Sequence, residues 1–164
     1  MLIARMSRGL PLEEESISGG DLGGPGGRGS RLAHHGLLMV TTSLAGVTLL
    51  VVDDDPHVRG LYVTVLRQAG ASVMSTGVAS EAVGLIELQL PDVVITDLNM
   101  PGHDGIWLLR ELKARSPGLP VILISGHVEE SRRDKLVELG FANVLTKPLP
   151  LSDLANAVAR VVGR

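Results

Sequence analysis

The strongest restriction on the fold of this chain comes from five short apolar runs that alternate with amphipathic segments. The runs cover residues 47–52, 72–76, 92–96, 120–125 and 142–146. They read as continuous rather than alternating, which is typical of strands covered on both faces. Helical patterns lie at residues 58–68, 80–89, 105–115, 129–139 and 152–162, with Ser152 at a predicted capping position. Because strand–helix–strand crossovers are right-handed, the pattern predicts an α/β fold with a five-stranded parallel sheet and helices on both faces.

The N-terminal region differs from the rest of the chain in composition. Seven of the twelve residues from 19 to 30 are glycine, so ordering this backbone would cost more free energy than its few apolar side chains return. We therefore expect residues 1–46 to be a disordered, glycine-rich tail and residues 47–164 to form one domain. His34 and His35 are interpreted as solvated tail residues rather than a metal site, and Met39 offers an alternative start of translation.

Composition excludes several classes of function. A chain of 164 residues, 45% of them hydrophobic, can bury one core. A net charge of −3 with one Trp, one Tyr and one Phe argues against direct nucleic-acid binding. Without cysteine the chain has no disulfide and no thiol chemistry, and no apolar run reaches the roughly 18 to 20 residues of a membrane helix. We expect a cytoplasmic protein with no membrane partner.

Polar residues follow four of the five predicted strands. Because the carboxyl ends of parallel strands meet at one edge of a sheet, these side chains are expected to converge. Oxygen ligands from two strands suit a hard ion such as Mg²⁺, while an ammonium and a hydroxyl suit phosphoryl oxygens. The pattern predicts a phosphoryl-transfer site in which Asp97 is the nucleophile. The residues concerned are Asp53, Asp54, Asp55, Asp97, Ser125 and Lys147.

Four motifs in this order resemble the receiver family of two-component response regulators, in the stand-alone form typified by the chemotaxis receiver. They are VVDDDP, DLNMPGHDG beginning at Asp97, LIS before Gly126, and TKPL around Lys147, and the resemblance covers residues 47–163. It implies a flavodoxin-like (βα)5 fold and a signalling domain rather than an enzyme. Asp97 would accept a phosphoryl group, with Mg²⁺ as cofactor, from a sensor histidine kinase or a histidine phosphotransfer protein.

The resemblance also implies roles for individual residues. Asp54 and Asp97 would bind Mg²⁺ directly, Asn99 through its backbone carbonyl, and Asp53 through water. Ser125 would close on the phosphoryl oxygens, and Lys147 would pair with the phosphate or with Asp97. Asn99 and His127 stand where similar proteins tune the loss of the phosphate, although His127 is equally well explained as an ordinary loop residue. Gly126 leaves the corner after Ser125 open and mobile.

Other matched positions concern structure and output. Asp104 is expected to cap a helix, and Lys147–Pro148 is expected to be cis as in the family. Asp55 has no matched role and is expected to be a solvated or helix-capping residue. Val144 stands where many receivers carry an aromatic switch residue, and Leu149 where an aromatic residue often follows Lys-Pro. The output face is expected within residues 128–162. Receivers often pair through the fourth and fifth helices, so the resemblance also allows a homodimer on phosphorylation.

Alternative functions remain open at this point. Asp53 and Asp55 also fit the paired acids of haloacid-dehalogenase-like phosphatases, with Asp53 as nucleophile, although the further acids and cap insertion of that family have no counterpart after Lys147. A degenerate receiver that serves only as a binding scaffold is a second alternative. The third is a receiver fragment of a larger regulator or hybrid kinase. If the chain is not such a fragment, we expect no attached output domain, because only one helix is predicted after Lys147, and we expect the effector to be a separate, unknown protein.

Overall fold

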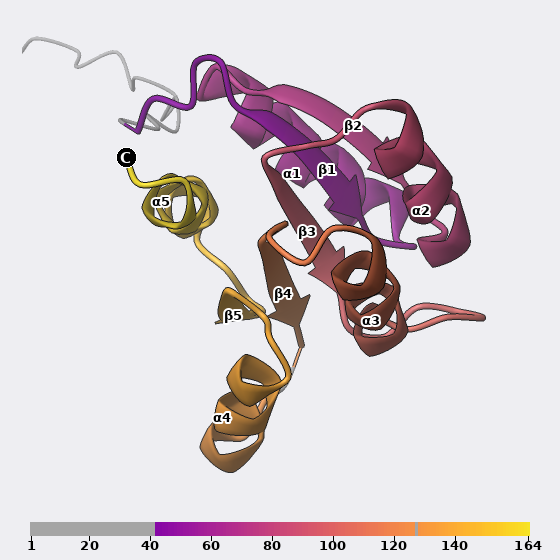
Figure 1. Ribbon diagram of the computed structural model, residues 1–164. Coiled ribbons are helices and arrows are strands. Elements are labelled where there is room, and N and C mark those ends of the chain that lie inside the picture. The colour runs from indigo at the N-terminus through magenta and orange to yellow at the C-terminus, as the bar shows by residue number, and fades with distance from the viewer. Residues whose placement is uncertain (1–41, 127) are drawn as a thin grey trace, which may run out of the picture. The chain divides into compact units, whose positions relative to one another are not determined.

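The computed structural model describes residues 42–126 and 128–164, which form alternating strands and helices (Figure 1). The strands are β1 (Thr48–Val52), β2 (Ser72–Thr76), β3 (Val93–Asp97), β4 (Val121–Ser125) and β5 (Asn143–Thr146). The helices are α1 (Pro56–Gln68), α2 (Ala79–Leu88), α3 (Gly105–Arg115), α4 (Glu130–Glu138) and α5 (Leu151–Val161). The predicted order of five strand–helix units is confirmed.

The five strands form one parallel sheet in the order β2-β1-β3-β4-β5. The strand order changes direction between β1 and β3, because the chain first adds β2 on one side of β1 and then continues on the other. In the register of these two strands Val52 lies opposite Thr96, so the residues that follow them lie side by side. Such a reversal at the carboxyl ends of parallel strands is where open α/β sheets bind ligands.

Helices cover both faces of the sheet. The core on one face joins β1, β3 and β4 to α1 and α5, with Leu66 and Val158 fully buried. The core on the other face joins the same strands to α2, α3 and α4, and includes Leu108 and Leu136. Because β1, β3 and β4 are buried on both sides, their sequences are continuously apolar, which explains the runs in the sequence.

Two helix starts follow the predicted capping chemistry, and a third does not. Asp55 caps α1 and Asp104 caps α3, each accepting hydrogen bonds from backbone N–H groups of the first turn. The capping position predicted for Ser152 is wrong. Helix α5 starts one residue earlier, its cap residue is Pro150, and the cap makes no side-chain hydrogen bond. Proline fixes φ near the helical value, so the helix begins directly after it without a polar cap.

Residues 42–46 pack on the domain, although we expected them to belong to the tail. Leu44 is fully buried in the core between the sheet and helices α1 and α5, and its N–H donates to the carbonyl of Ala69 at 2.7 Å. Arg164 donates to the carbonyl of Ala45 at 2.6 Å. The described fold therefore begins before residue 47. The remainder of the predicted tail, residues 1–41, lies outside the described residues.

The two edge strands each have a main-chain group bonded to a side chain. At the β2 edge, Arg67 donates to the carbonyl of Val73 at 2.9 Å. At the β5 edge, the amide of Val144 donates to the side-chain carbonyl of Asn143 at 2.8 Å. Among the helices in residues 42–126 and 128–164, none has the length and apolar character needed to cross a bilayer.

Candidate functional site

An ammonium group joins two buried carboxylates at the carboxyl end of the sheet. Asp53 directly follows β1, Asp97 ends β3, and Lys147 directly follows β5. The Lys147 Nζ lies 2.7 Å from Asp97 Oδ1 and 3.2 Å from Asp53 Oδ2. Asp53 is 2% exposed and Asp97 is 8% exposed. The structure thus brings three of the predicted site residues together at the predicted edge, and the Lys147–Pro148 bond is cis as expected.

Burial and charge act in opposite directions on these groups. Burial raises the pKa of Asp53, and the neighbouring Lys147 charge offsets only part of that rise. Burial alone would lower the pKa of Lys147, but its hydrogen bond to Asp97 and the charges of both carboxylates outweigh burial and raise it. Lys147 therefore remains positively charged at neutral pH, and one positive charge faces two buried acids.

The acidic turn between β1 and α1 separates its three aspartates into different environments. Asp55 Oδ1 accepts from the amides of His57 at 2.8 Å and Val58 at 3.2 Å, and these bonds lower its pKa. The Asp55 amide donates to Asp53 Oδ1 at 2.9 Å. Asp54 is exposed and makes no hydrogen bond with the other described residues. Of the three carboxylates, only that of Asp54 is uncommitted, and Asp55 has the capping role expected for it.

Asp97 is held at its carboxylate and at its backbone. Its Oδ2 accepts from the amide of Asn99 at 2.7 Å, while Oδ1 is bonded to Lys147. The Thr96 hydroxyl donates to the Asp97 carbonyl at 2.9 Å. At Gly105, the first residue of α3, an added Cβ would approach that same carbonyl more closely than real Cβ atoms ever do. The absence of a side chain at Gly105 therefore allows α3 to start directly against Asp97.

Ser125 has a buried hydroxyl without a hydrogen-bond partner in the described part of the chain. The residue ends β4, is 1% exposed, and its carbonyl accepts from the Lys147 amide at 2.8 Å. A buried hydroxyl without a partner costs free energy, so the position favours a ligand that supplies one. Gly126 is exposed, and an added Cβ there would meet no atom within 4 Å. His127 lies outside the described residues.

The carboxylates at this edge suit a hard cation that keeps part of its water shell, rather than a metal ion bound by protein ligands alone. Within residues 42–126 and 128–164, no group of three or more acidic or histidine side chains is arranged to hold a metal by itself. The carboxylates near the site are Asp53 and Asp97, which share Lys147, and the uncommitted Asp54. Mg²⁺ usually keeps several waters and takes only one or two carboxylates, so these residues suit it.

Comparisons with known proteins identify the family. The model for the response regulator receiver domain matches residues 49–159. The chain belongs to the response-regulator receiver family. An uncharacterized 14.6 kDa protein of Leptolyngbya boryana is 36% identical over 118 residues, which cover 71% of this chain and 90% of that protein. The C4-dicarboxylate transport transcriptional regulatory protein DctD of Pseudomonas aeruginosa is 36% identical over 118 residues, covering 72% of this chain and 26% of DctD. The chain thus spans about a quarter of DctD.

Solved receiver structures have the same fold. A putative response regulator from Chloroflexus aurantiacus matches with a TM-score of 0.67 and 32% identity, covering 72% of this chain and 98% of that one. The Francisella response regulator 1452 receiver domain matches with a TM-score of 0.68 and 29% identity, covering 72% and 98%. The flavodoxin-like fold is therefore confirmed. Receiver domains are signalling domains, so membership of this family argues against the phosphatase alternative. That alternative also needs the Asp55 carboxylate free, whereas here it caps α1.

In this receiver the position expected to carry an aromatic switch residue is filled by Val144. It lies on β5, is 1% exposed, and packs in the core with Leu136 and Phe141. The surface expected to signal output includes two exposed apolar residues near the end of α4, Val137 and Leu139. A conformational change at that surface therefore cannot involve the rotation of an aromatic ring at residue 144 and must depend on other side chains.

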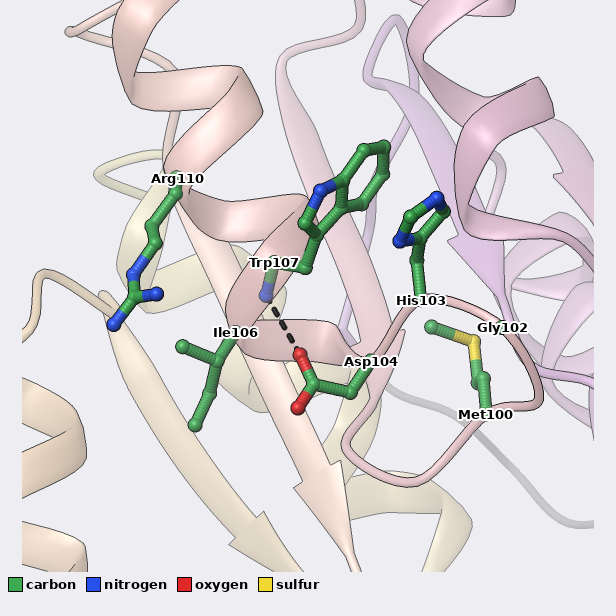
Figure 2. A pocket seen from close by; sticks show the side chains of 7 residues that line it. All are labelled: Met100, Gly102, His103, Asp104, Ile106, Trp107 and Arg110. Atoms are coloured by element: carbon green, nitrogen blue, oxygen red, sulfur yellow. Dashed lines mark hydrogen bonds between the residues drawn. The ribbon is translucent and has the colours of Figure 1, made fainter.

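A separate pocket lies at the start of α3 and contains neither Lys147 nor the acidic turn. The His103 ring stacks on that of Trp107, with ring centroids 3.8 Å apart. Figure 2 shows these two side chains and the hydrogen bond that Asp104 accepts from the Trp107 amide. The lining residues are Met100, Gly102, His103, Asp104, Ile106, Trp107 and Arg110. Asp104 therefore has the structural capping role that its position after the turn predicts.

Two residues at the receiver site were missed from the sequence. Gly105 was expected only as the start of a helix, yet it makes room for the Asp97 carbonyl. Arg59 in α1 was given no role, yet its Nη1 donates to the carbonyl of Asp53 at 2.5 Å. The sequence signal for Arg59 is a basic residue one turn into the helix that follows the acidic triplet.

Proposed function

We propose that this receiver is a Mg²⁺-dependent phosphoryl acceptor in which Asp97 takes the phosphoryl group from a histidine kinase or a histidine phosphotransfer protein. The observation that carries the proposal is the arrangement around Asp97. Its carboxylate is bonded to Lys147, the same ammonium contacts Asp53, and the Lys147 amide bonds to Ser125, whose buried hydroxyl has no partner among the described residues.

The proposed reaction is an in-line transfer from nitrogen to oxygen. A carboxylate oxygen of Asp97 attacks phosphorus, the new O–P bond forms, and the bond from phosphorus to the donor imidazole breaks. The electrons of that bond stay on the imidazole, whose other ring nitrogen carries the proton that keeps the leaving ring neutral. Asp54, Asp97 and the Asn99 carbonyl would hold Mg²⁺, with Asp53 acting through water. When bound, the ion would supply positive charge to neutralise the phosphoryl oxygens.

Lys147 and Ser125 have complementary tasks in this proposal. Lys147 pairs with the Asp97 carboxylate before transfer and with the phosphoryl oxygens afterwards. Ser125 donates its hydroxyl to one of those oxygens, which gives this buried group the partner it lacks in the described residues. Gly126 and His127 are proposed to affect how readily water reaches the phosphate, since they follow Ser125 directly.

The proposed output is a change of the α4–β5–α5 face, with its exposed Val137 and Leu139, that alters binding of a separate effector or of a second copy of the chain. Because the kinase partners of receivers phosphorylate their substrates in the cytoplasm, we place the protein there.

The test is phosphorylation of the purified full chain by acetyl phosphate in the presence of Mg²⁺, followed by intact-mass measurement and mapping of the modified residue. We expect the modification to be absent in Asp97→Asn. It should be kept in Asp104→Asn, a matched change at an exposed helix-capping aspartate. Chelation of Mg²⁺ should abolish the reaction. Modification of Asp53 instead, or equal modification of the wild type and Asp97→Asn, would overturn the proposal.

A further inference from the structure

The acidic turn holds its backbone at several points but leaves the Asp54 side chain without a partner among the described residues. The Asp53 amide donates to the carbonyl of Thr76 at 3.2 Å, and the Asp55 amide donates to Asp53 Oδ1 at 2.9 Å. Asp54 lies between these residues and is exposed. Its direction is therefore determined by the orientation of its backbone rather than by contacts of its own carboxylate.

Arg59 makes the bond that fixes the peptide plane immediately before Asp54. Its Nη1 donates to the carbonyl of Asp53 at 2.5 Å, and that carbonyl belongs to the peptide unit whose nitrogen is Asp54 N. Across the described residues, Arg59 is the one side chain outside the acidic triplet that bonds to the triplet's backbone oxygens or nitrogens. Rotation of this peptide would turn the Asp54 side chain, so the guanidinium limits that rotation.

The guanidinium lies beside Gly77, the residue that follows β2. A Cβ added to Gly77, just after β2, would come within 2.9 Å of Arg59 Nη1 and within 3.7 Å of the Asp53 carbonyl. The side chain thus passes over a glycine that has no side chain to displace it. The Arg59 amide also bonds to the Asp55 carbonyl at 2.9 Å, which anchors its own backbone to the same turn.

We propose that Arg59 is a positioning residue for Mg²⁺ binding, which acts by orienting the Asp53–Asp54 peptide so that the Asp54 carboxylate faces the ion. The inference rests on the proposed function, because it takes Asp54 as a ligand. Arg59 does not touch the ion or the phosphoryl group in this scheme. Its charge and its geometry have opposite effects: a guanidinium near a cation site repels the ion, whereas an oriented Asp54 attracts it.

Because the two effects are opposite, the direction in which Mg²⁺ affinity changes on replacing Arg59 decides between them. Arg59→Met removes both the charge and the donor while keeping much of the side-chain volume, and Mg²⁺ binding is measured by calorimetry on the full chain. A positioning role predicts that Mg²⁺ binds about tenfold more weakly, the size expected for loss of one charge-assisted hydrogen bond. Arg59→Lys, which keeps a charged donor, should recover part of this loss. Unchanged or tighter binding in Arg59→Met would overturn the inference.

A second measurement needs no metal. In the ion-free protein, hydrogen exchange of the Asp55 amide should become faster in Arg59→Met, because the turn loses a restraint, while amides in β4 keep their protection. Exchange identical to the wild type would count against the role. If the wild type bound no Mg²⁺ at all, the proposed function would fail together with this inference. If the wild type bound Mg²⁺ and Arg59→Met bound it equally well, only the inference about Arg59 would fail.

Discussion

Substitution of Gly105 by alanine should destabilise the domain, although the residue lies in a helix where alanine is normally favoured. An added Cβ would run into the Asp97 carbonyl and would lie 3.2 Å from both Leu98 Cα and Leu123 Cδ1. Backbone atoms cannot move aside as a flexible side chain can, so α3 or the end of β3 must shift. Forcing extra atoms into a packed site costs about 1 to 3 kcal/mol.

Gly84 in α2 offers the same chemical change without the collision. An added Cβ there meets no atom within 4 Å, so Gly84→Ala should stabilise the domain by about 0.5 to 1 kcal/mol through the lower backbone entropy of the unfolded chain. The two variants should therefore differ by about 1.5 to 4 kcal/mol. Urea unfolding, followed by circular dichroism and by the fluorescence of Trp107, which is the single tryptophan, measures both values.

The outcome that refutes this reasoning is a Gly105→Ala variant as stable as Gly84→Ala. It would mean that the start of α3 is not packed against the Asp97 backbone as described. A destabilised but folded Gly105→Ala variant should also be phosphorylated more slowly by acetyl phosphate, because the displaced carbonyl belongs to the acceptor residue. Gly84→Ala should react at the wild-type rate.

Three further predictions concern the site and its surroundings. Ser125→Ala should raise the free energy of unfolding by about 1 kcal/mol in urea titrations, since it removes a buried hydroxyl without a partner among the described residues. The same variant should be phosphorylated at Asp97 more slowly, and a loss of stability would contradict the burial argument. Asp54→Ala should weaken Mg²⁺ binding far more than Asp55→Ala in calorimetric titrations, because Asp55 is committed to the helix cap, and equal losses would show that the assignment of the acidic turn is wrong. Burial raises the pKa of Tyr62, so the phenol loses its proton in the unfolded chain at a lower pH than in the folded protein. The free energy of unfolding should therefore fall as the pH rises above the ordinary pKa of 10.0, and the absorbance of the single tyrosine reports its ionisation. Tyr62→Phe should show a smaller fall, and a pH dependence identical to that of the wild type would refute the link.

Features governed by short-range chemistry could be predicted from the sequence. Asp55 and Asp104 each precede a helix and accept bonds from its first amides, so type and position were sufficient to predict their roles. The meeting of Asp53, Asp97 and Lys147 followed from a rule about the carboxyl ends of parallel strands rather than from any local pattern. Both kinds of prediction depend on the order of strands and helices, which the apolar runs make plain.

Features that depend on the path of one side chain or on packing at a distance could not be predicted. The contact of Arg59 with the Asp53 carbonyl requires the angle between α1 and β1, which residue spacing does not give. Leu44 was assigned to the tail because glycine-rich sequence precedes it, yet it fills a space beside α1 and α5. Ser152 had the residue type of a cap, but Pro150 determines where α5 begins.

The side chains of Arg67 and Asn143 have a consequence for how this receiver behaves at high concentration. An open sheet offers unpaired main-chain groups along its outer strands, and these can recruit a strand from another molecule into a growing aggregate. Here the Val73 carbonyl and the Val144 amide already have intramolecular partners at the two margins. Each margin therefore has one main-chain group fewer to offer to an incoming strand.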